Sequence, residues 1–231
     1  MTRPKYIDMY KDFLMLVKKS RVGTVIPEEF VRLLNLAIEE VVSQRIAVLE
    51  LNKKVNDDLL PLKMSQKDLV LVSDNTDPFG GYITSVAIGS AGSYRRIASV
   101  KVDLIKAGVP STKKNVKCYF LSSFEASDVL GGYYSRPSVF KCYYMPVLSS
   151  NQYKIRVYIP AEYNVSKCSC DLYLNPGIVL LSDVTNLNNQ CQFNMEVSSA
   201  IVNVAARMCI ESNADPRYQS FLNEQQIKSN N

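Results

Sequence analysis

Histidine and tryptophan are absent from this chain of 231 residues. Without histidine, neither a Ser-His-Asp triad nor a Cys-His pair can form, and the commonest general base and metal ligand is missing. Carboxylates, lysine or a metal-bound oxygen could still act, so an enzyme that uses aspartate or glutamate with a divalent metal stays open as an alternative. We nevertheless expect no catalytic residues and a protein that is not an enzyme.

The sequence also lacks the usual loops for phosphates and metals. Gly89–Ser93 is rich in glycine, but it has neither the G-x-x-x-x-G-K nor the G-x-G-x-x-G spacing. Asp74–Asp77 offers oxygen ligands of the kind calcium prefers, without the twelve-residue loop and its terminal glutamate. Because Pro78 and Gly80 follow it, we interpret this segment as a turn. We expect no cofactor and no metal site.

Long apolar runs are missing as well, and no segment reaches the ~18 residues of a membrane helix. No apolar stretch follows the first residues, so we expect no signal peptide, no membrane association and synthesis in the cytoplasm. The six cysteines then favour buried free thiols over disulfides. Cys168 and Cys170 should share one side of a strand, because side chains alternate along it.

The residues that are present predict an α+β fold in three parts. Residues 1–62 should form an N-terminal αα-hairpin, 63–190 a mainly antiparallel β domain, and 191–231 C-terminal helices and a tail. Gly177–Leu181 is expected to be the last strand of the β domain. A short final helix should start at Asp215-Pro216, where aspartate can cap and proline fits the first turn.

The segment Gly23–Leu51 predicts a long amphipathic helix. Pro27 suits its first position, and Glu28 and Glu29 complement the helix dipole. If it continued to Val55, the helix would be about 43 Å long at about 1.5 Å per residue. We expect its apolar stripe to pack on the preceding helix, which leaves its polar face for assembly. The apolar stripe comprises Phe30, Leu33, Leu34, Ala37, Ile38, Val41 and Val42.

The net charge of +5 is spread thinly along the chain. A nucleic-acid binder usually concentrates basic residues on one face. The densest basic points of the β region are Arg95-Arg96 and Lys113-Lys114, and tyrosines gather in the same region. We interpret the tyrosines mainly as cross-strand packing. Nucleic-acid binding by a basic, tyrosine-rich β surface remains the alternative function.

Three stretches resemble a known group of proteins. Phe13 with Lys18-Lys19, Gly23, and then Ile26–Phe30 and Asn35–Glu39 look like the opening of virion structural proteins of crAss-like tailed bacteriophages. Those phages infect gut Bacteroides-type hosts. Ile201–Arg207 followed by Glu211–Tyr218 is similar to the terminal helix and tail of their neck-ring proteins. The strand sequences Cys142–Pro146 and Ile155–Pro160 fit the same group.

The resemblance implies a structural virion protein, a subunit of the head-to-tail connector or neck. Its expected partners are further copies of itself in a ring, commonly of twelve, the portal protein, and other neck or tail rings. DNA would pass through the channel without sequence-specific binding. Candidate interface residues are Arg32, Asn35, Glu39 and Gln44. Candidate channel-facing residues are Arg95, Arg96, Lys113 and Lys114.

Overall fold

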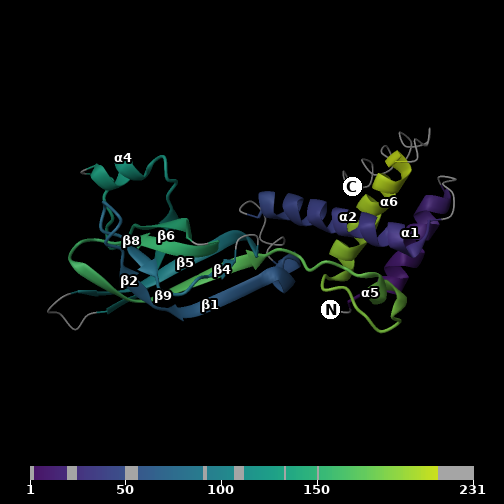
Figure 1. The fold of residues 1–231 in the computed structure, drawn as a ribbon, viewed down its shortest axis with the longest axis horizontal. Coiled ribbons are helices and arrows are strands. Elements are labelled where there is room, and N and C mark those ends of the chain that lie inside the picture. Colours follow the sequence, from purple (N-terminus) through teal and green to yellow (C-terminus); the bar gives the residue numbers. More distant parts are fainter. Residues whose placement is uncertain are drawn as a thin grey trace. The chain divides into compact units, whose positions relative to one another are not determined.

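The computed structural model describes residues 3–19, 25–49, 57–90, 93–106, 112–132, 134–149 and 151–212, and it confirms the α+β class (Figure 1). The chain divides into two compact units. The helical unit comprises Met1–Pro61 and Pro176–Asn231, and the β unit comprises Leu62–Asn175. The two helical ends, expected as separate parts 1–62 and 191–231, therefore belong to one unit. Residues 176–190, expected in the β part, belong to it too.

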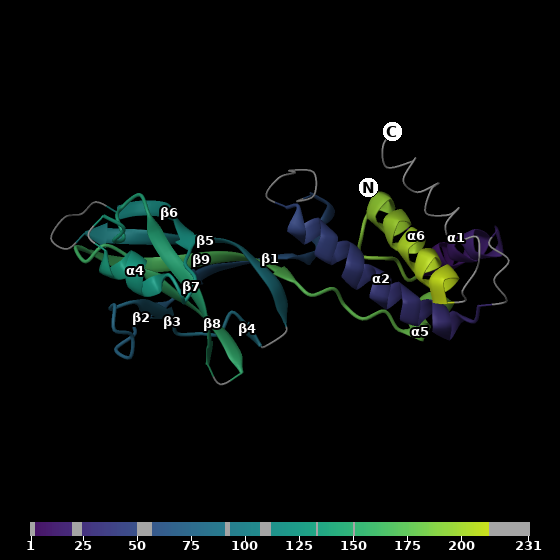
Figure 2. The same ribbon diagram turned by 90° about the horizontal axis from the view of Figure 1, so that it is seen from above.

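The helical unit is built around its C-terminal helix. Its longer helices within the described residues are α1 (Tyr6–Lys19), α2 (Pro27–Ala47) and α6 (Met195–Ser212), and α5 (Leu181–Thr185) is a short one. Both α1 and α2 pack on α6, as Figures 1 and 2 show. We expected the apolar stripe of α2 to pack on α1. This was wrong, because the main partner of α2 is α6. Because α6 meets two helices, its buried face is broad and runs from Val197 to Ile210.

Aromatic rings join α1 to α2 near the start of α2. Phe30 is fully buried, and its ring centroid lies 4.9 Å from that of Phe13 and 5.0 Å from that of Tyr10. The Tyr10 hydroxyl donates a hydrogen bond to the carbonyl of Val25 at 2.9 Å. This contact fixes where the chain enters α2.

Helix α2 starts as expected and ends sooner. Pro27 occupies its first turn, with Glu28 and Glu29 beside it. The helix has 21 residues and is thus about 32 Å long at about 1.5 Å per residue. The expected continuation to Leu51 or Val55 was wrong at Val48 and Leu49, which form a turn. Val42 is the last fully buried side chain of the stripe, five residues before the end of the helix.

Residues 176–180 form an extended segment without strand pairing, so the strand expected at Gly177–Leu181 was wrong. The side chain of Asn35 on α2 takes the place of a neighbouring strand. Its amide nitrogen donates to the Val179 carbonyl, and its amide oxygen accepts from the Val179 N–H, both at 2.9 Å. The extended segment is thereby bonded to a helix side chain instead of a sheet.

Replacing Asn35 with alanine should lower the free energy of unfolding by about 1–3 kcal/mol, because both backbone groups of Val179 lose their partner. Urea titration followed by circular dichroism measures this change. Arg32→Ala, an exposed change on the same helix, is the matched control and should stay within about 0.5 kcal/mol. Equal effects of the two changes would contradict the role of Asn35.

The β unit contains one nine-stranded sheet in the order β1-β9-β5-β6-β7-β8-β3-β2, with β4 paired to β8. Figure 2 shows the strands from above. All pairings are antiparallel except that of β6 with β7. The strands are β1 (Lys63–Leu69), β2 (Leu71–Ser73), β3 (Tyr82–Thr84), β4 (Gly89–Ser90), β5 (Tyr94–Lys106), β6 (Thr112–Phe120), β7 (Cys142–Ser149), β8 (Gln152–Tyr158) and β9 (Tyr163–Leu174). A 3-10 turn, Leu60–Leu62, precedes β1.

Local signals for this unit are largely confirmed. The hairpin between β7 and β8 turns at Asn151, whose φ of 62° is the left-handed conformation that asparagine tolerates. The short helix α4 (Ala126–Gly131) ends at the expected glycines. All six cysteines are free and buried, and Cys168 and Cys170 share the core face. Tyr143 and Tyr158 pair across β7 and β8 and are buried.

Within the described ranges, the helices are all too short or too polar to cross a bilayer. The expected final helix at Asp215-Pro216 lies outside the residues that the structure describes.

Candidate functional site

The acidic segment Asp74–Asp77 is a turn, as expected, and its two carboxylates have a structural partner. Arg156 on β8 donates from Nε to Asp74 at 2.9 Å and from Nη1 to Asp77 at 3.3 Å. The Asp77 carboxylate also accepts the Gly81 N–H at 2.9 Å. Among the described residues, no group of three or more Asp, Glu or Cys side chains is placed to hold a metal ion.

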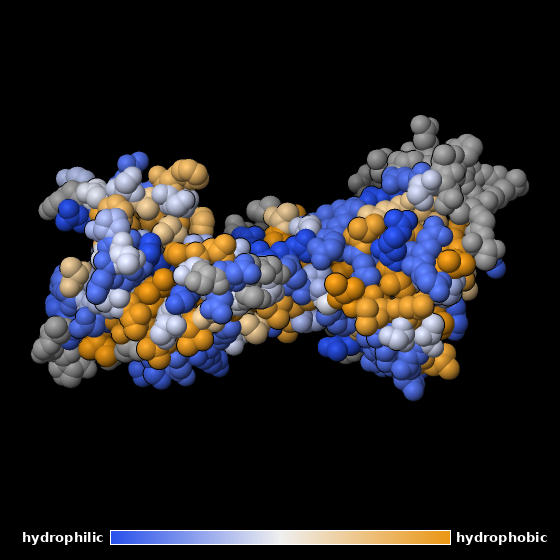
Figure 3. All heavy atoms as spheres, in the orientation of Figure 1, coloured by the Kyte–Doolittle hydropathy of each residue, from blue (hydrophilic) through white to orange (hydrophobic). Residues whose placement is uncertain are grey.

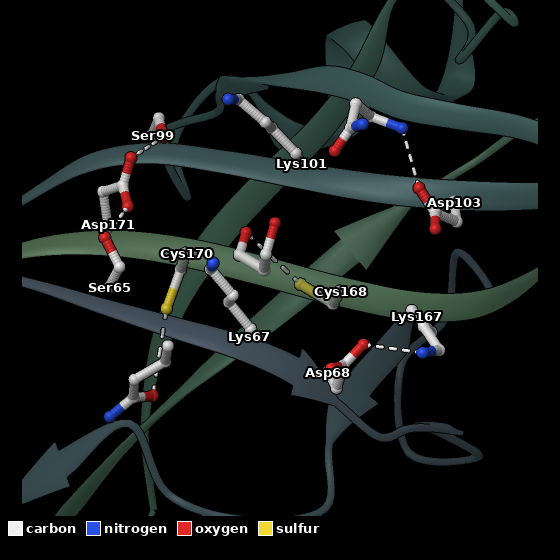
Figure 4. A pocket seen from close by; sticks show the side chains of 13 residues that line it. Ser65, Lys67, Asp68, Ser99, Lys101, Asp103, Lys167, Cys168, Cys170 and Asp171 are labelled. Carbon is white, nitrogen blue, oxygen red and sulfur yellow. Dashed lines mark hydrogen bonds and ion pairs between the residues drawn. The ribbon is translucent and has the colours of Figure 1, made fainter.

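A polar hollow of about 350 Å³ lies on the face of β1, β9, β5 and β6 that points away from the core (Figure 4). The alternation of side chains along the strands produces this hollow. Val100, Val102 and Leu104 of β5 are buried in the core, so the residues between them point to the opposite face. The side chains lining the hollow include Ser65, Lys67, Asp68, Ser99, Lys101, Asp103, Asn115, Lys167, Ser169 and Asp171.

The carboxylates of the hollow already have partners. Asp171 accepts hydrogen bonds from Ser65 at 2.5 Å and Ser99 at 2.9 Å, and Lys63 lies 3.7 Å away. Asp68 pairs with Lys167 at 2.8 Å. Asp103 accepts the backbone N–H of Asn115 at 2.7 Å. Figure 4 marks the contacts of Asp171 with Ser65 and Ser99, and that of Asp68 with Lys167, as dashed lines.

The pKa shifts agree with this pairing. Burial acts to raise the pKa of Asp171, but the hydrogen bonds from Ser65 and Ser99 and the charges of Lys63 and Lys101 outweigh it, so this pKa is lowered. The hydrogen bond from Lys167 lowers the pKa of Asp68, and its partner's pKa is raised in turn. Asp171 and Asp68 therefore act as structural anions at neutral pH.

Three lysines cross the same face in one line, which we call the lysine row: Lys67, Lys101 and Lys117. Lys101 and Lys117 are directly opposite one another on β5 and β6, and Lys101 is opposite Ser169 on β9. Lys67 follows Gln66, the partner of Cys170, where the pairing of β1 with β9 shifts register, and it lines the same hollow as Lys101 and Ser169. All three are exposed, and none forms an ion pair with a carboxylate of the described residues.

The lysine row is placed between the paired carboxylates. Asp171, opposite Ser99, lies on one side of the lysine row. The ion pair between Asp68 and Lys167 lies on the other side. Asp68 and Asn115 adopt left-handed φ angles of 56° and 57° where the pairings of β1 and β6 shift register. Such bulges redirect side chains at the edge of a site. The hollow is thus bounded by two local departures from regular strand pairing.

The four basic residues expected to face a channel do not meet in one place. Arg95 and Arg96 lie at the start of β5, whereas Lys113 pairs with Leu104, eight residues further along that strand. At about 3.4 Å per residue, this separates the two pairs by about 27 Å. Lys113 covers the ring of Phe140 at 4.9 Å, and Lys114 is exposed.

The four expected interface residues on α2 have different surroundings. Arg32, Glu39 and Gln44 are exposed, and Gln44 donates to Glu40 at 3.0 Å. Asn35 is half-buried and bonded to Val179 of its own chain. It is therefore a structural residue, and the other three remain candidates for a neighbouring subunit.

Sequence reasoning missed the lysine row because its members come from strands far apart in the chain. Alternation in Ser99–Asp103 places Lys101 on a polar face, but nothing local indicates that Lys67 and Lys117 share it. Only the strand order brings them together. Comparison of the chain with protein-family models and with curated proteins finds no match.

Proposed function

We propose that this protein is a structural, non-enzymatic virion protein, a subunit of a ring in the head-to-tail connector of a tailed bacteriophage. In this role it links the portal to the tail and surrounds the DNA channel. Its partners are further copies of itself, the portal, and adjoining neck or tail rings. The sequence resemblance suggests this role. One structural observation supports the assembly of several copies of the protein.

That observation is a concentration of exposed aromatic side chains in the segment from Tyr119 to Phe140, which comprises the end of β6 and its connection to β7 through α4. Phe124 is 93% exposed and Phe140 is 84% exposed. Every exposed aromatic side chain of the described residues except Phe79 lies in this segment. Aromatic residues are enriched at protein interfaces, where they bury large areas. Their exposure in a single copy favours burial against another chain.

Exposed apolar side chains also occur in the helical unit. Ile178 is 80% exposed and Leu187 is 65% exposed. Figure 3 shows hydrophobic surface, in orange, on both units. A ring subunit needs two different contact surfaces, because a head-to-tail interface repeats until the rotation closes. Apolar surface on both units is compatible with this requirement.

Nucleic-acid binding as the main function has less support. The four basic residues expected to carry it lie at two ends of β5, and most tyrosines of the sheet are buried or half-buried. Bases need exposed aromatic faces for stacking. We therefore favour DNA contact as one part of the connector role over DNA binding as the main function.

Mass photometry of the purified protein over a range of concentrations tests the proposal. We expect closed oligomers, and mass spectrometry should detect the protein in purified phage particles. Replacing Phe124 and Phe140 with serine should shift the population toward smaller species. The stability of one copy should change by less than about 0.5 kcal/mol, because both side chains are exposed.

Val70→Ser with Val86→Ser is the matched control, since both valines are exposed in the β unit outside the aromatic segment. We expect this control to assemble as the original protein does. A protein that is strictly monomeric and missing from particles would refute the connector role. If both double variants assemble unchanged, the aromatic segment is not an interface.

A further inference from the structure

We infer that the lysine row, Lys67, Lys101 and Lys117, contacts the phosphate backbone of double-stranded DNA. This inference deepens the proposed function, on which it rests for the source of the DNA. It assigns the contact to residues other than the Arg95, Arg96, Lys113 and Lys114 expected from the sequence. The binding itself can be measured without an assembled ring.

The lysine row carries more positive charge than its carboxylate neighbours offset. Lys101 and Lys67 help to lower the pKa values of Asp171 and Asp68, but both carboxylates have other, stronger partners. Like charges directly opposite one another in a sheet are destabilising, and Lys101 and Lys117 are such a pair. Asp171, on one side of the row, already accepts two hydroxyl hydrogen bonds and pairs with Lys63. Asp103, two residues from Lys101 on β5, accepts the N–H of Asn115. On the other side, Asp68 pairs with Lys167. The face therefore gains from an external anion that lies along the row.

The spacing of the three lysines suits an extended anion. Neighbouring strands lie about 4.8 Å apart, so Lys101 and Lys117 are adjacent, and Lys67 is about 10 Å from Lys101 across β9. Ser169 lies between the latter two, and its hydroxyl can donate to an anion. Three positive charges and a hydroxyl thus form a line across four strands. A line of charges fits an extended polyanion better than one small ion.

The side chains around the lysine row favour duplex DNA over other polyanions. A membrane-binding surface carries apolar side chains beside its lysines, whereas the hollow is lined mainly by serine, lysine and aspartate. Single-stranded nucleic acid needs aromatic platforms for its bases. Tyr119, beside the row, lies under the ammonium of Lys117, with its ring centroid 5.4 Å from Nζ. Lysines without stacking platforms fit backbone contact with a duplex.

The surrounding aspartates limit the strength of this contact. Asp68, Asp103 and Asp171 lie beside the lysines and repel phosphates. We therefore expect weak, sequence-independent binding, with a Kd of about 10⁻⁴ to 10⁻⁵ M near physiological salt. Weak binding suits a channel through which DNA must move.

Fluorescence anisotropy with a short labelled duplex, at salt from about 50 to about 200 mM, tests the inference. The key variant carries Lys67→Gln, Lys101→Gln and Lys117→Gln. Its affinity at about 50 mM salt should fall at least about ten-fold, and the slope of log K against log salt should become shallower by up to about 2.7, at about 0.9 per phosphate contact. Two DNA sequences should bind equally.

Lys11→Gln, Lys18→Gln and Lys19→Gln together are the matched control, because they remove three exposed lysines and the same net charge from α1. This control should keep most of the affinity. A loss as large as that of the lysine-row variant would overturn the inference, since only net charge would then matter. So would an original protein that binds no duplex at about 50 mM salt, or one that binds phosphatidylserine vesicles but not DNA.

Two further measurements show whether a loss of DNA binding comes from an unfolded variant or from a failure to assemble. The thermal unfolding midpoint of the lysine-row variant should change little, because the relief of repulsion between Lys101 and Lys117 opposes the loss of attraction between Lys101 and Asp171. A folded variant with unchanged DNA affinity overturns the inference. Mass photometry of the same samples measures assembly independently. An original protein that assembles but does not bind duplex overturns this inference alone, and leaves the connector role standing.

Discussion

Replacing Arg156 with methionine should lower the free energy of unfolding by about 3–5 kcal/mol, because it leaves two buried carboxylates without their cation. The side chains of Asp74 and Asp77 are 8% and 3% exposed, and that of Arg156 is 16% exposed. Asp77 also accepts a hydrogen bond from the Tyr158 hydroxyl at 3.3 Å. Water therefore cannot readily replace the lost guanidinium. Urea unfolding followed by circular dichroism measures the effect.

Lys154→Met is the matched control. It lies two residues away on the same strand and face of β8, is half-buried, and forms no ion pair with a described carboxylate. We expect it to change stability by less than about 0.5 kcal/mol. Adding Asp74→Asn and Asp77→Asn to Arg156→Met should restore part of the loss, because the uncompensated charges are then gone. Equal effects of Arg156→Met and Lys154→Met would show that the ion pairs contribute little.

The loss caused by Arg156→Met should depend on pH. The Thr76 hydroxyl hydrogen bond lowers the pKa of Asp74 below 3.8 against the effect of burial, and Arg156 lowers it further. A lowered folded-state pKa contributes stability above the unfolded value and loses it as pH falls. The difference between the original protein and Arg156→Met should be largest near neutral pH and shrink below about pH 4. A constant difference from pH 7 to pH 3 would contradict this linkage.

Phe30→Ala should destabilise the helical unit by about 3–5 kcal/mol, the usual cost of removing a fully buried phenylalanine. Its ring fills the contact between α1 and α2 against Phe13 and Tyr10. The substitution leaves a cavity that α1 cannot close without losing the Tyr10 hydrogen bond to Val25. Thermal unfolding followed at the helical circular dichroism band measures the loss.

Phe124→Ala provides the control for Phe30→Ala, since it removes the same side chain where it is 93% exposed. We expect its effect on thermal unfolding to stay within about 0.5 kcal/mol. If the two units unfold separately, only the helical transition should move in Phe30→Ala. An unchanged helical transition would show that the aromatic contact is not needed for this unit.

Local rules of sequence were enough for the parts of the molecule that depend on neighbouring residues. Pro27 predicts the start of α2, the turn residues around Asn151 predict the β7–β8 hairpin, and Cys168 and Cys170 follow strand alternation into the core. Each of these depends on backbone preferences or side-chain periodicity over a few positions. They required no knowledge of the strand order.

The sequence by itself therefore determined the α+β class, the turn signals and the burial of the thiols. Only the tertiary structure decided that α2 packs mainly on α6, that Asn35 bonds to Val179, and that Asp74 and Asp77 bind Arg156. It also assembled the lysine row, because β1, β5 and β6 become neighbours of β9 or of one another only after folding. The physical reason is that periodicity shows which side of an element is buried, whereas the partner on that side is chosen by long-range packing and strand pairing.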